Sequence, residues 1–163
     1  SPVCLALVLT LVAAIPAAAG LIPATAGCRV CFGQAGGRLC LPEAQAEAVL
    51  LDILARAGEV HDELFNEAGV AELTGRWPWA ELTLPQPRNI PREDGRGLMT
   101  VSRLLVVFRN DLPSYVFWGD PDYRLDAVLG APQLGRAPLA ALRALPGGSQ
   151  PLSDKAAERK RSP

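Results

Sequence analysis

The residues best suited to chemistry are three closely spaced cysteines, Cys28, Cys31 and Cys40, followed by the single histidine, His61. A Cys-x-x-Cys pair can carry thiol–disulfide exchange when its first cysteine begins a helix, because the helix dipole lowers the thiol pKa. Together with His61, the three cysteines also supply the ligand types that zinc accepts. In an oxidising compartment the same cysteines would instead form a structural disulfide.

The spacing around the cysteines favours the structural disulfide. Residues 32–37 are rich in glycine and make a poor helix start, which argues against an activated redox pair. The cysteines and His61 lack the second closely spaced ligand pair of most zinc sites, so we predict no metal and no other cofactor. Three disulfide candidates are an odd number, which leaves one thiol for an intermolecular bond.

An apolar leader precedes these cysteines. Residues 3–15 have the length of a signal-peptide apolar core, and Ala24-Thr25-Ala26 fits a cleavage site. We therefore expect residues 1–26 to be a signal peptide, with a membrane anchor or a plain buried helix as alternatives. The predicted location is secreted or cell surface. Membrane association would arise through residues 3–26 or through an anchor beyond the C-terminal end.

Charge and motifs exclude several function classes. Sixteen Lys and Arg against seventeen Asp and Glu give a net charge of −1, which provides no field to attract nucleic acid. The sequence contains no phosphate-binding glycine loop and no Gly-x-Ser-x-Gly elbow. We therefore predict that the protein is not an enzyme and that its partner is another protein.

The clearest element is a helix predicted over residues 42–68, within a cysteine-stapled helical region at 27–75. Apolar residues recur there at helical spacing, although Gly58 can mark a break between two shorter helices. Such an apolar stripe must be buried against the rest of the chain or against a partner. Its candidate partner-binding residues are Leu50, Ile53, Leu54, Leu64 and Phe65.

The following region, residues 76–148, is rich in proline. Two apolar runs, 98–108 and 115–118, flank a turn at 110–113 and predict a β-hairpin. Residues 138–145 can form one or two helical turns. Trp77 and Trp79 are candidates for a partner-binding patch, or alternatively for the edge of a small core.

The predicted fold is therefore mainly α with a small β-hairpin. It combines the signal segment, one long amphipathic helix and a Pro/Gly-rich, partly disordered C-terminal half. The last segment, residues 149–163, is polar and charged and is expected to be a disordered tail.

The N-terminal cysteine pattern also resembles a known family. The leader, the sequences Cys28-Arg29-Val30-Cys31-Phe32 and Gly37-Arg38-Leu39-Cys40, and the acidic helix after them resemble the N-terminus of the Izumo-type gamete-fusion proteins. The sperm acrosome membrane-associated members of that group are the most similar in appearance. The resemblance covers residues 24–68, and this chain lacks the second Cys-x-x-Cys of that family.

This resemblance implies a sperm-surface protein with a helical bundle that acts in sperm–egg adhesion or fusion without catalysis. We therefore expect a non-enzymatic secreted or cell-surface protein-binding protein with a role in fertilisation. One alternative is a secreted signalling-type polypeptide processed at its basic tail, Arg159-Lys160-Arg161. Another is a thiol-redox protein that uses Cys28 and Cys31.

Overall fold

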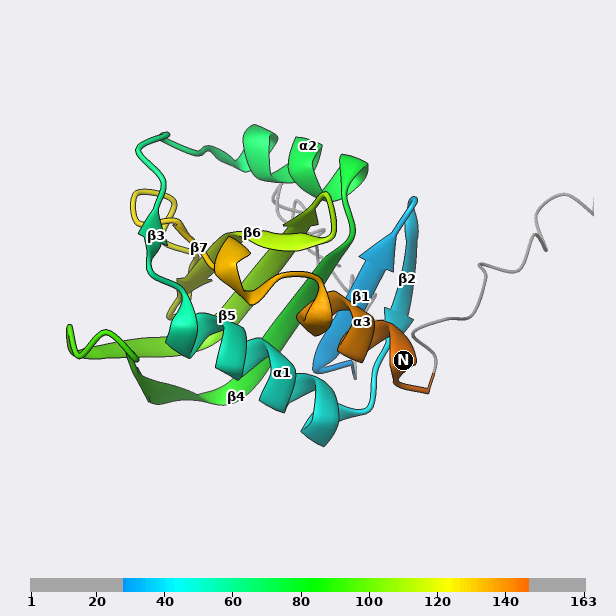
Figure 1. Ribbon diagram of the computed structural model, residues 1–163, viewed down its shortest axis with the longest axis horizontal. Helices are drawn as coiled ribbons and strands as arrows, with labels where there is room; N and C mark the ends of the chain where they lie inside the picture. The colour runs from blue at the N-terminus through cyan, green and yellow to red at the C-terminus, as the bar shows by residue number, and fades with distance from the viewer. Residues whose placement is uncertain (1–27, 147–163) are drawn as a thin grey trace, which may run out of the picture.

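The computed structural model describes residues 28–146, which fold around one antiparallel sheet of seven strands (Figure 1). The strand order across the sheet is β2-β1-β4-β5-β6-β7-β3. The strands are β1 (Val30–Gln34), β2 (Gly37–Cys40), β3 (Glu59–Val60), β4 (Trp79–Pro91), β5 (Leu98–Arg109), β6 (Leu112–Gly119) and β7 (Leu129–Gly130). The helices are α1 (Glu43–Arg56), α2 (Glu67–Arg76), the short 3₁₀ helix η1 (Pro132–Leu134) and α3 (Ala137–Ala144). The predicted signal segment 1–26 and the predicted tail 149–163 lie outside the described residues.

The prediction of a mainly α protein with a partly disordered second half is wrong. Strands account for 39% of the structure and helices for 29%. The long strand β4 was missed because Pro85 and Pro87 argue against a strand. Both prolines lie where the β4–β5 pairing is interrupted, between Thr83 and Arg88, and a proline is tolerated where ladder hydrogen bonds are absent.

The single long helix predicted over 42–68 is also wrong. α1 ends at Arg56, Ala57 adopts an extended conformation, and β3 then pairs with β7. A second helix, α2, starts after Asn66, whose side-chain oxygen accepts a hydrogen bond of 2.8 Å from the backbone N–H of Gly69. This N-cap starts α2 independently of α1. The apolar spacing therefore continues through a segment that is not helical.

The predicted hairpin and C-terminal helix are confirmed. β5 and β6 pair antiparallel around Asn110 and Asp111, whose φ angles of 54° and 65° suit a two-residue hairpin turn. The hairpin is longer than predicted, and it is built into the larger sheet. α3 occupies the segment that was expected to form one or two helical turns.

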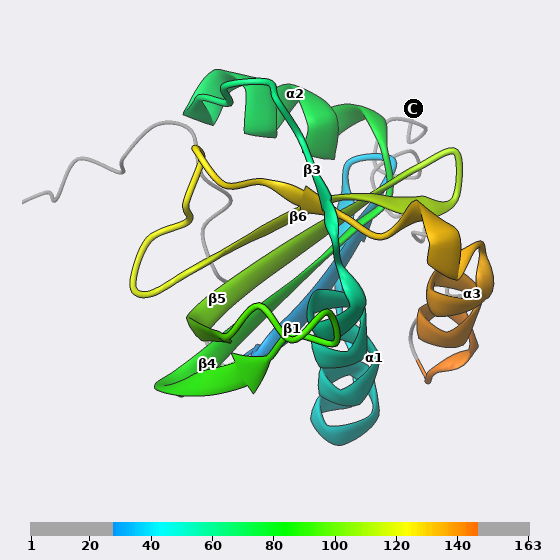
Figure 2. The same ribbon diagram turned by 60° about the vertical axis from the view of Figure 1, so that its left-hand side comes forward.

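The helices lie on both faces of the sheet (Figures 1 and 2). α1 and α3 cover one face, where Leu50, Ile53 and Leu142 pack against apolar strand residues. α2 covers the opposite face, where Val70 packs with a second cluster of strand residues. Successive residues of a strand point to opposite faces, so β4 supplies both clusters.

Candidate functional site

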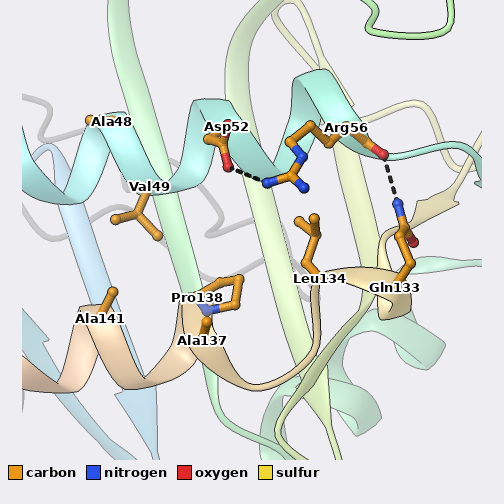
Figure 3. A pocket seen from close by; sticks show the side chains of 9 residues that line it. All are labelled: Ala48, Val49, Asp52, Arg56, Gln133, Leu134, Ala137, Pro138 and Ala141. Carbon is orange, nitrogen blue, oxygen red and sulfur yellow. Dashed lines mark hydrogen bonds and ion pairs between the residues drawn. The ribbon is translucent and has the colours of Figure 1, made fainter.

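A surface hollow of the described residues lies between α1 and α3 (Figure 3). It has a volume of about 490 Å³. Val49, Leu134 and Pro138 are half-buried and form an apolar floor. Its walls are exposed residues of both helices and of η1: Ala48, Asp52, Arg56, Gln133, Ala137 and Ala141. We call this hollow the α1–α3 groove.

Two polar contacts fix one end of the α1–α3 groove. The side chain of Gln133 donates a hydrogen bond of 2.9 Å from Nε2 to the backbone oxygen of Arg56, which ties η1 to the last turn of α1. The Arg56 guanidinium pairs with Asp52 one turn earlier, at 3.4 Å (Figure 3). Arg56 also pairs with Glu93 of the β4–β5 loop, at 3.3 Å.

The β4–β5 loop is further attached to α1 by a backbone hydrogen bond of 2.9 Å from the Glu93 N–H to the Ala55 oxygen. A second hollow lies between this loop and α1, and it shares Asp52 and Arg56 with the groove. The Asp52–Arg56 pair therefore stands between two depressions on the outer side of α1. Both side chains are about half exposed, so the pair contributes little to stability and is available to a ligand.

The groove is suited to binding rather than to acid–base chemistry. Its ionisable groups, Asp52 and Arg56, already form an ion pair with each other. Its three alanines leave room for a backbone or a large side chain to approach the half-buried floor. Open, shallow grooves between helices with an apolar floor typically receive an amphipathic segment of another protein.

The three cysteines meet at one end of the sheet. Cys28 and Cys40 form a disulfide with a Cα–Cα distance of 5.7 Å, so the prediction of a disulfide is confirmed. Cys31 is a buried, unbonded cysteine whose Sγ lies 3.2 Å from the Cys28 Sγ. The pair Cys28 and Cys31 is thus not the disulfide, and Cys28 does not begin a helix.

The histidine lies elsewhere. His61 follows β3, with its Nε2 2.7 Å from the backbone oxygen of Ser114 and its ring stacked on Tyr115 at 4.7 Å. Within residues 28–146, no group of three or more His, Cys, Asp and Glu side chains is arranged to hold a metal ion. The structure does not bring His61 and the cysteines together.

The partner-binding residues predicted from the helical spacing fall in different places. Leu50, Ile53 and Leu54 are fully buried in the core beneath α1, where a partner cannot reach them. Leu64 is 88% exposed in the segment before α2, and Phe65 is half-buried with its ring against Tyr115 and Phe117. Only the neighbours of the buried stripe, such as Val49, line the groove.

The two tryptophans also separate. Trp79 is 4% exposed, and its ring packs against Gly33 of β1 with the Arg38 guanidinium over it at 5.4 Å. Trp77 is half-buried at the end of α2. The pair therefore does not form one exposed patch.

Sequence reasoning missed a buried polar cluster on the α2 face. Glu81 of β4 is 2% exposed, and its Oε1 accepts hydrogen bonds from the Arg103 guanidinium at 2.9 Å and from the Tyr123 hydroxyl at 2.6 Å. Its other oxygen, Oε2, is buried without a hydrogen-bond partner. The available signal was a glutamate flanked by Ala80 and Leu82 in β4, together with an arginine inside β5.

This cluster controls the ionisation of Tyr123. Burial of the phenol, together with the nearby Glu81 carboxylate, raises the pKa of Tyr123 well above its ordinary value of 10.0. The Arg103 guanidinium stacks over the Tyr123 ring at 4.6 Å. The Glu81 carboxylate thus links β4 to β5 and to the segment after β6.

Comparisons with known proteins found no matching family model, no matching curated protein and no matching solved structure. These comparisons therefore assign no function to the fold or to the groove. None of the helices within residues 28–146 is both long and apolar enough to cross a bilayer.

Proposed function

We propose that this is a non-enzymatic protein-binding protein that receives an amphipathic helix of its partner in the α1–α3 groove. The observation that carries the proposal is an open apolar floor, Val49, Leu134 and Pro138, between two helices that expose alanines beside it. A helix places apolar side chains every three or four residues along one face, which matches a groove that runs between two helices.

The charged pair at the end of the groove provides orientation. Asp52 and Arg56 are exposed and lie beside the apolar floor, so polar residues on the flank of a bound helix can contact them. Such contacts at a solvent-exposed rim select the partner's orientation and contribute modestly to affinity. The apolar floor then supplies most of the binding free energy.

We further propose that the partner is a secreted or cell-surface protein. A disulfide such as Cys28–Cys40 persists in oxidising compartments and is rare in the cytosol, which supports export of this chain. The role in sperm–egg adhesion stays a prediction that comes from the cysteine pattern. The helical bundle implied by the same resemblance is not what residues 28–146 form.

A display selection tests the groove. The folded, disulfide-bonded protein would be used to select from a displayed library of helical peptides taken from extracellular proteins. We expect enriched peptides with an apolar residue at every third or fourth position, and binding that Ala141→Arg abolishes. The matched control is Ala140→Arg, because Ala140 is exposed on the same helix but does not line the groove.

Two outcomes would contradict the proposal. One is a selection that enriches no helical peptide. The other is a set of enriched peptides that bind the Ala141→Arg and Ala140→Arg variants equally well. Circular dichroism of both variants would show that the fold is retained.

A further inference from the structure

The buried thiol of Cys31 lies in contact with the disulfide of the same chain. Its Sγ is 3.2 Å from the Cys28 Sγ, and the Cys28 Sγ is bonded to Cys40. Cys31 is also the register partner of Cys40 on β2 and of Glu81 on β4. Cys40, Cys31 and Glu81 therefore form one row across β2, β1 and β4, and the Cys28 sulfur, from just before β1, joins the two cysteines of that row.

The two ends of this sulfur cluster differ in exposure. Cys31 is 4% exposed and Cys28 is 8% exposed. Cys40 is exposed, and its strand β2 is at the edge of the sheet. A thiol at position 31 is thus hidden from other molecules, whereas a thiol at position 40 would face solvent.

We propose that thiol–disulfide exchange within the chain brings Cys31 into the disulfide and releases Cys40 as the free thiol. Cys40 is then the site at which a partner is attached through a mixed disulfide. The Cys31 thiolate attacks the Cys28 sulfur, the Cys28–Sγ to Cys31–Sγ bond forms, and the Cys28–Cys40 bond breaks. Cys40 leaves as a thiolate and takes up the proton that Cys31 lost. One disulfide and one thiol are present before and after, so the step needs no oxidant or reductant.

The groups around Cys31 support an exchange in which Cys31 attacks the Cys28 sulfur. The structure places the Cys28 sulfur within reach of the Cys31 thiol, at 3.2 Å, which supports attack at Cys28. Directly opposite residues of paired antiparallel strands hold their Cβ atoms about 5 Å apart, so Glu81 lies beside Cys31. Its Oε2 is a buried acceptor without a hydrogen-bond partner.

The second step attaches a disulfide-bearing partner. The Cys40 thiolate attacks one sulfur of an external disulfide, forms a mixed disulfide and releases the other sulfur as a thiol. The exposed edge position of β2 admits such a partner, and the buried position of Cys31 does not. This attachment is independent of the α1–α3 groove. Cys28 and Cys31 belong to the core cluster on the α2 face of the sheet, and the groove lies on the opposite face.

The test uses oxidised glutathione as the disulfide probe. The folded wild-type protein is incubated with it, remaining thiols are blocked with N-ethylmaleimide, and the chain is digested with trypsin. Cleavage after Arg29 and Arg38 places Cys28, Cys31 and Cys40 in three different peptides, so mass spectrometry reports the connectivity directly. We expect glutathione on the peptide of Cys40 and a disulfide between the peptides of Cys28 and Cys31.

The Cys31→Ala variant is the matched comparison. Without the internal nucleophile it should retain Cys28–Cys40 and carry no glutathione on Cys40. Glutathione found on Cys31 or on Cys28 of the wild type would overturn the proposal, as would the absence of any adduct. The wild-type connectivity is decisive by itself if Cys31→Ala folds poorly.

Discussion

Glu81, Arg103 and Tyr123 show how single polar residues constrain the sheet. The Glu81 carboxylate is almost fully buried, and it is tolerated there because a guanidinium and a phenol donate hydrogen bonds to it. Removing one partner of such a group leaves a buried charge without compensation, which is a larger loss than the pair's own contribution to stability. Residues of this cluster should therefore be sensitive even to conservative substitution.

The raised pKa of Tyr123 predicts alkaline sensitivity. Tyr123 ionises near its ordinary pKa in the unfolded chain but only at higher pH in the folded protein. Above about pH 10 the native state thus binds more protons than the unfolded state, and stability falls by up to about 1.4 kcal/mol per pH unit. Below that pH the contribution is fully present. Urea unfolding measured below and above about pH 10 should show this fall.

Tyr123→Phe should flatten the alkaline decline, and Tyr115→Phe is the matched control on the same face of the sheet. Both are best measured with Cys31→Ala, which removes the thiol that would exchange at high pH. The contradicting result is a free energy of unfolding that falls equally steeply with pH in Cys31→Ala alone and in Cys31→Ala combined with Tyr123→Phe. That result would show that Tyr123 is not the group responsible.

At the scale of elements, contact between β1 and β4 depends on a glycine. A Cβ atom built on Gly33 would lie 2.0 Å from the ring of Trp79, which is itself buried. The ring therefore occupies the space that any other residue at position 33 would need. This contact joins β1, next to the edge strand β2, to the centre of the sheet.

Gly33→Ala should lower the free energy of unfolding by about 1–3 kcal/mol or more, because the Trp79 ring must shift from its packed position. Gly75→Ala is the control, since Gly75 is in α2 and has nothing within 4 Å of a built Cβ. We expect that change to be neutral or stabilising by up to about 1 kcal/mol. Equal effects of the two substitutions on urea unfolding would contradict the packing account.

The elements also show how far the sequence could predict the fold. The β5–β6 hairpin and α3 were predictable, because turn residues and apolar runs specify them locally. β4 was not, since its prolines argue against a strand and only the β5 pairing around them reveals it. The break between α1 and α2 was signalled by Gly58, but the pairing of β3 with β7 is a long-range contact that no local pattern encodes.

The site was less predictable than the fold. The apolar stripe of α1 was recognised, but which of its residues face the core depends on the sheet beneath it. Leu50, Ile53 and Leu54 are covered by the sheet, and Val49 is left in the groove because α3 returns beside α1. The groove therefore arises from two segments about 90 residues apart, so sequence spacing within one helix cannot define it.

At the scale of the whole molecule, the Cys28–Cys40 disulfide ties the start of the described chain to the edge strand. Cys28 and Cys40 are separated by 12 positions, so the bond closes a short loop. Bonds that close loops of this size contribute about 3 kcal/mol in the chain-entropy account. The disulfide thus stabilises the β1–β2 edge of the sheet.

Replacing both bonded cysteines, Cys28→Ala with Cys40→Ala, should therefore lower the free energy of unfolding by about 3 kcal/mol. Cys31→Ala, which leaves the disulfide intact, should change it much less. Urea unfolding of the purified variants measures both values. A Cys31→Ala loss as large as that of the double variant would mean that packing of the sulfur atoms, and not the crosslink, carries the stability.

The central claim is that the α1–α3 groove binds a helix of a partner protein. The most direct test is a titration of the ¹⁵N-labelled protein with an enriched helical peptide, followed by backbone amide chemical shifts. The account predicts that the largest changes fall on Ala48, Val49, Asp52, Leu134 and Ala141, which line the groove. Changes concentrated instead on α2, Leu64 and Trp77, on the opposite face of the sheet, would contradict it.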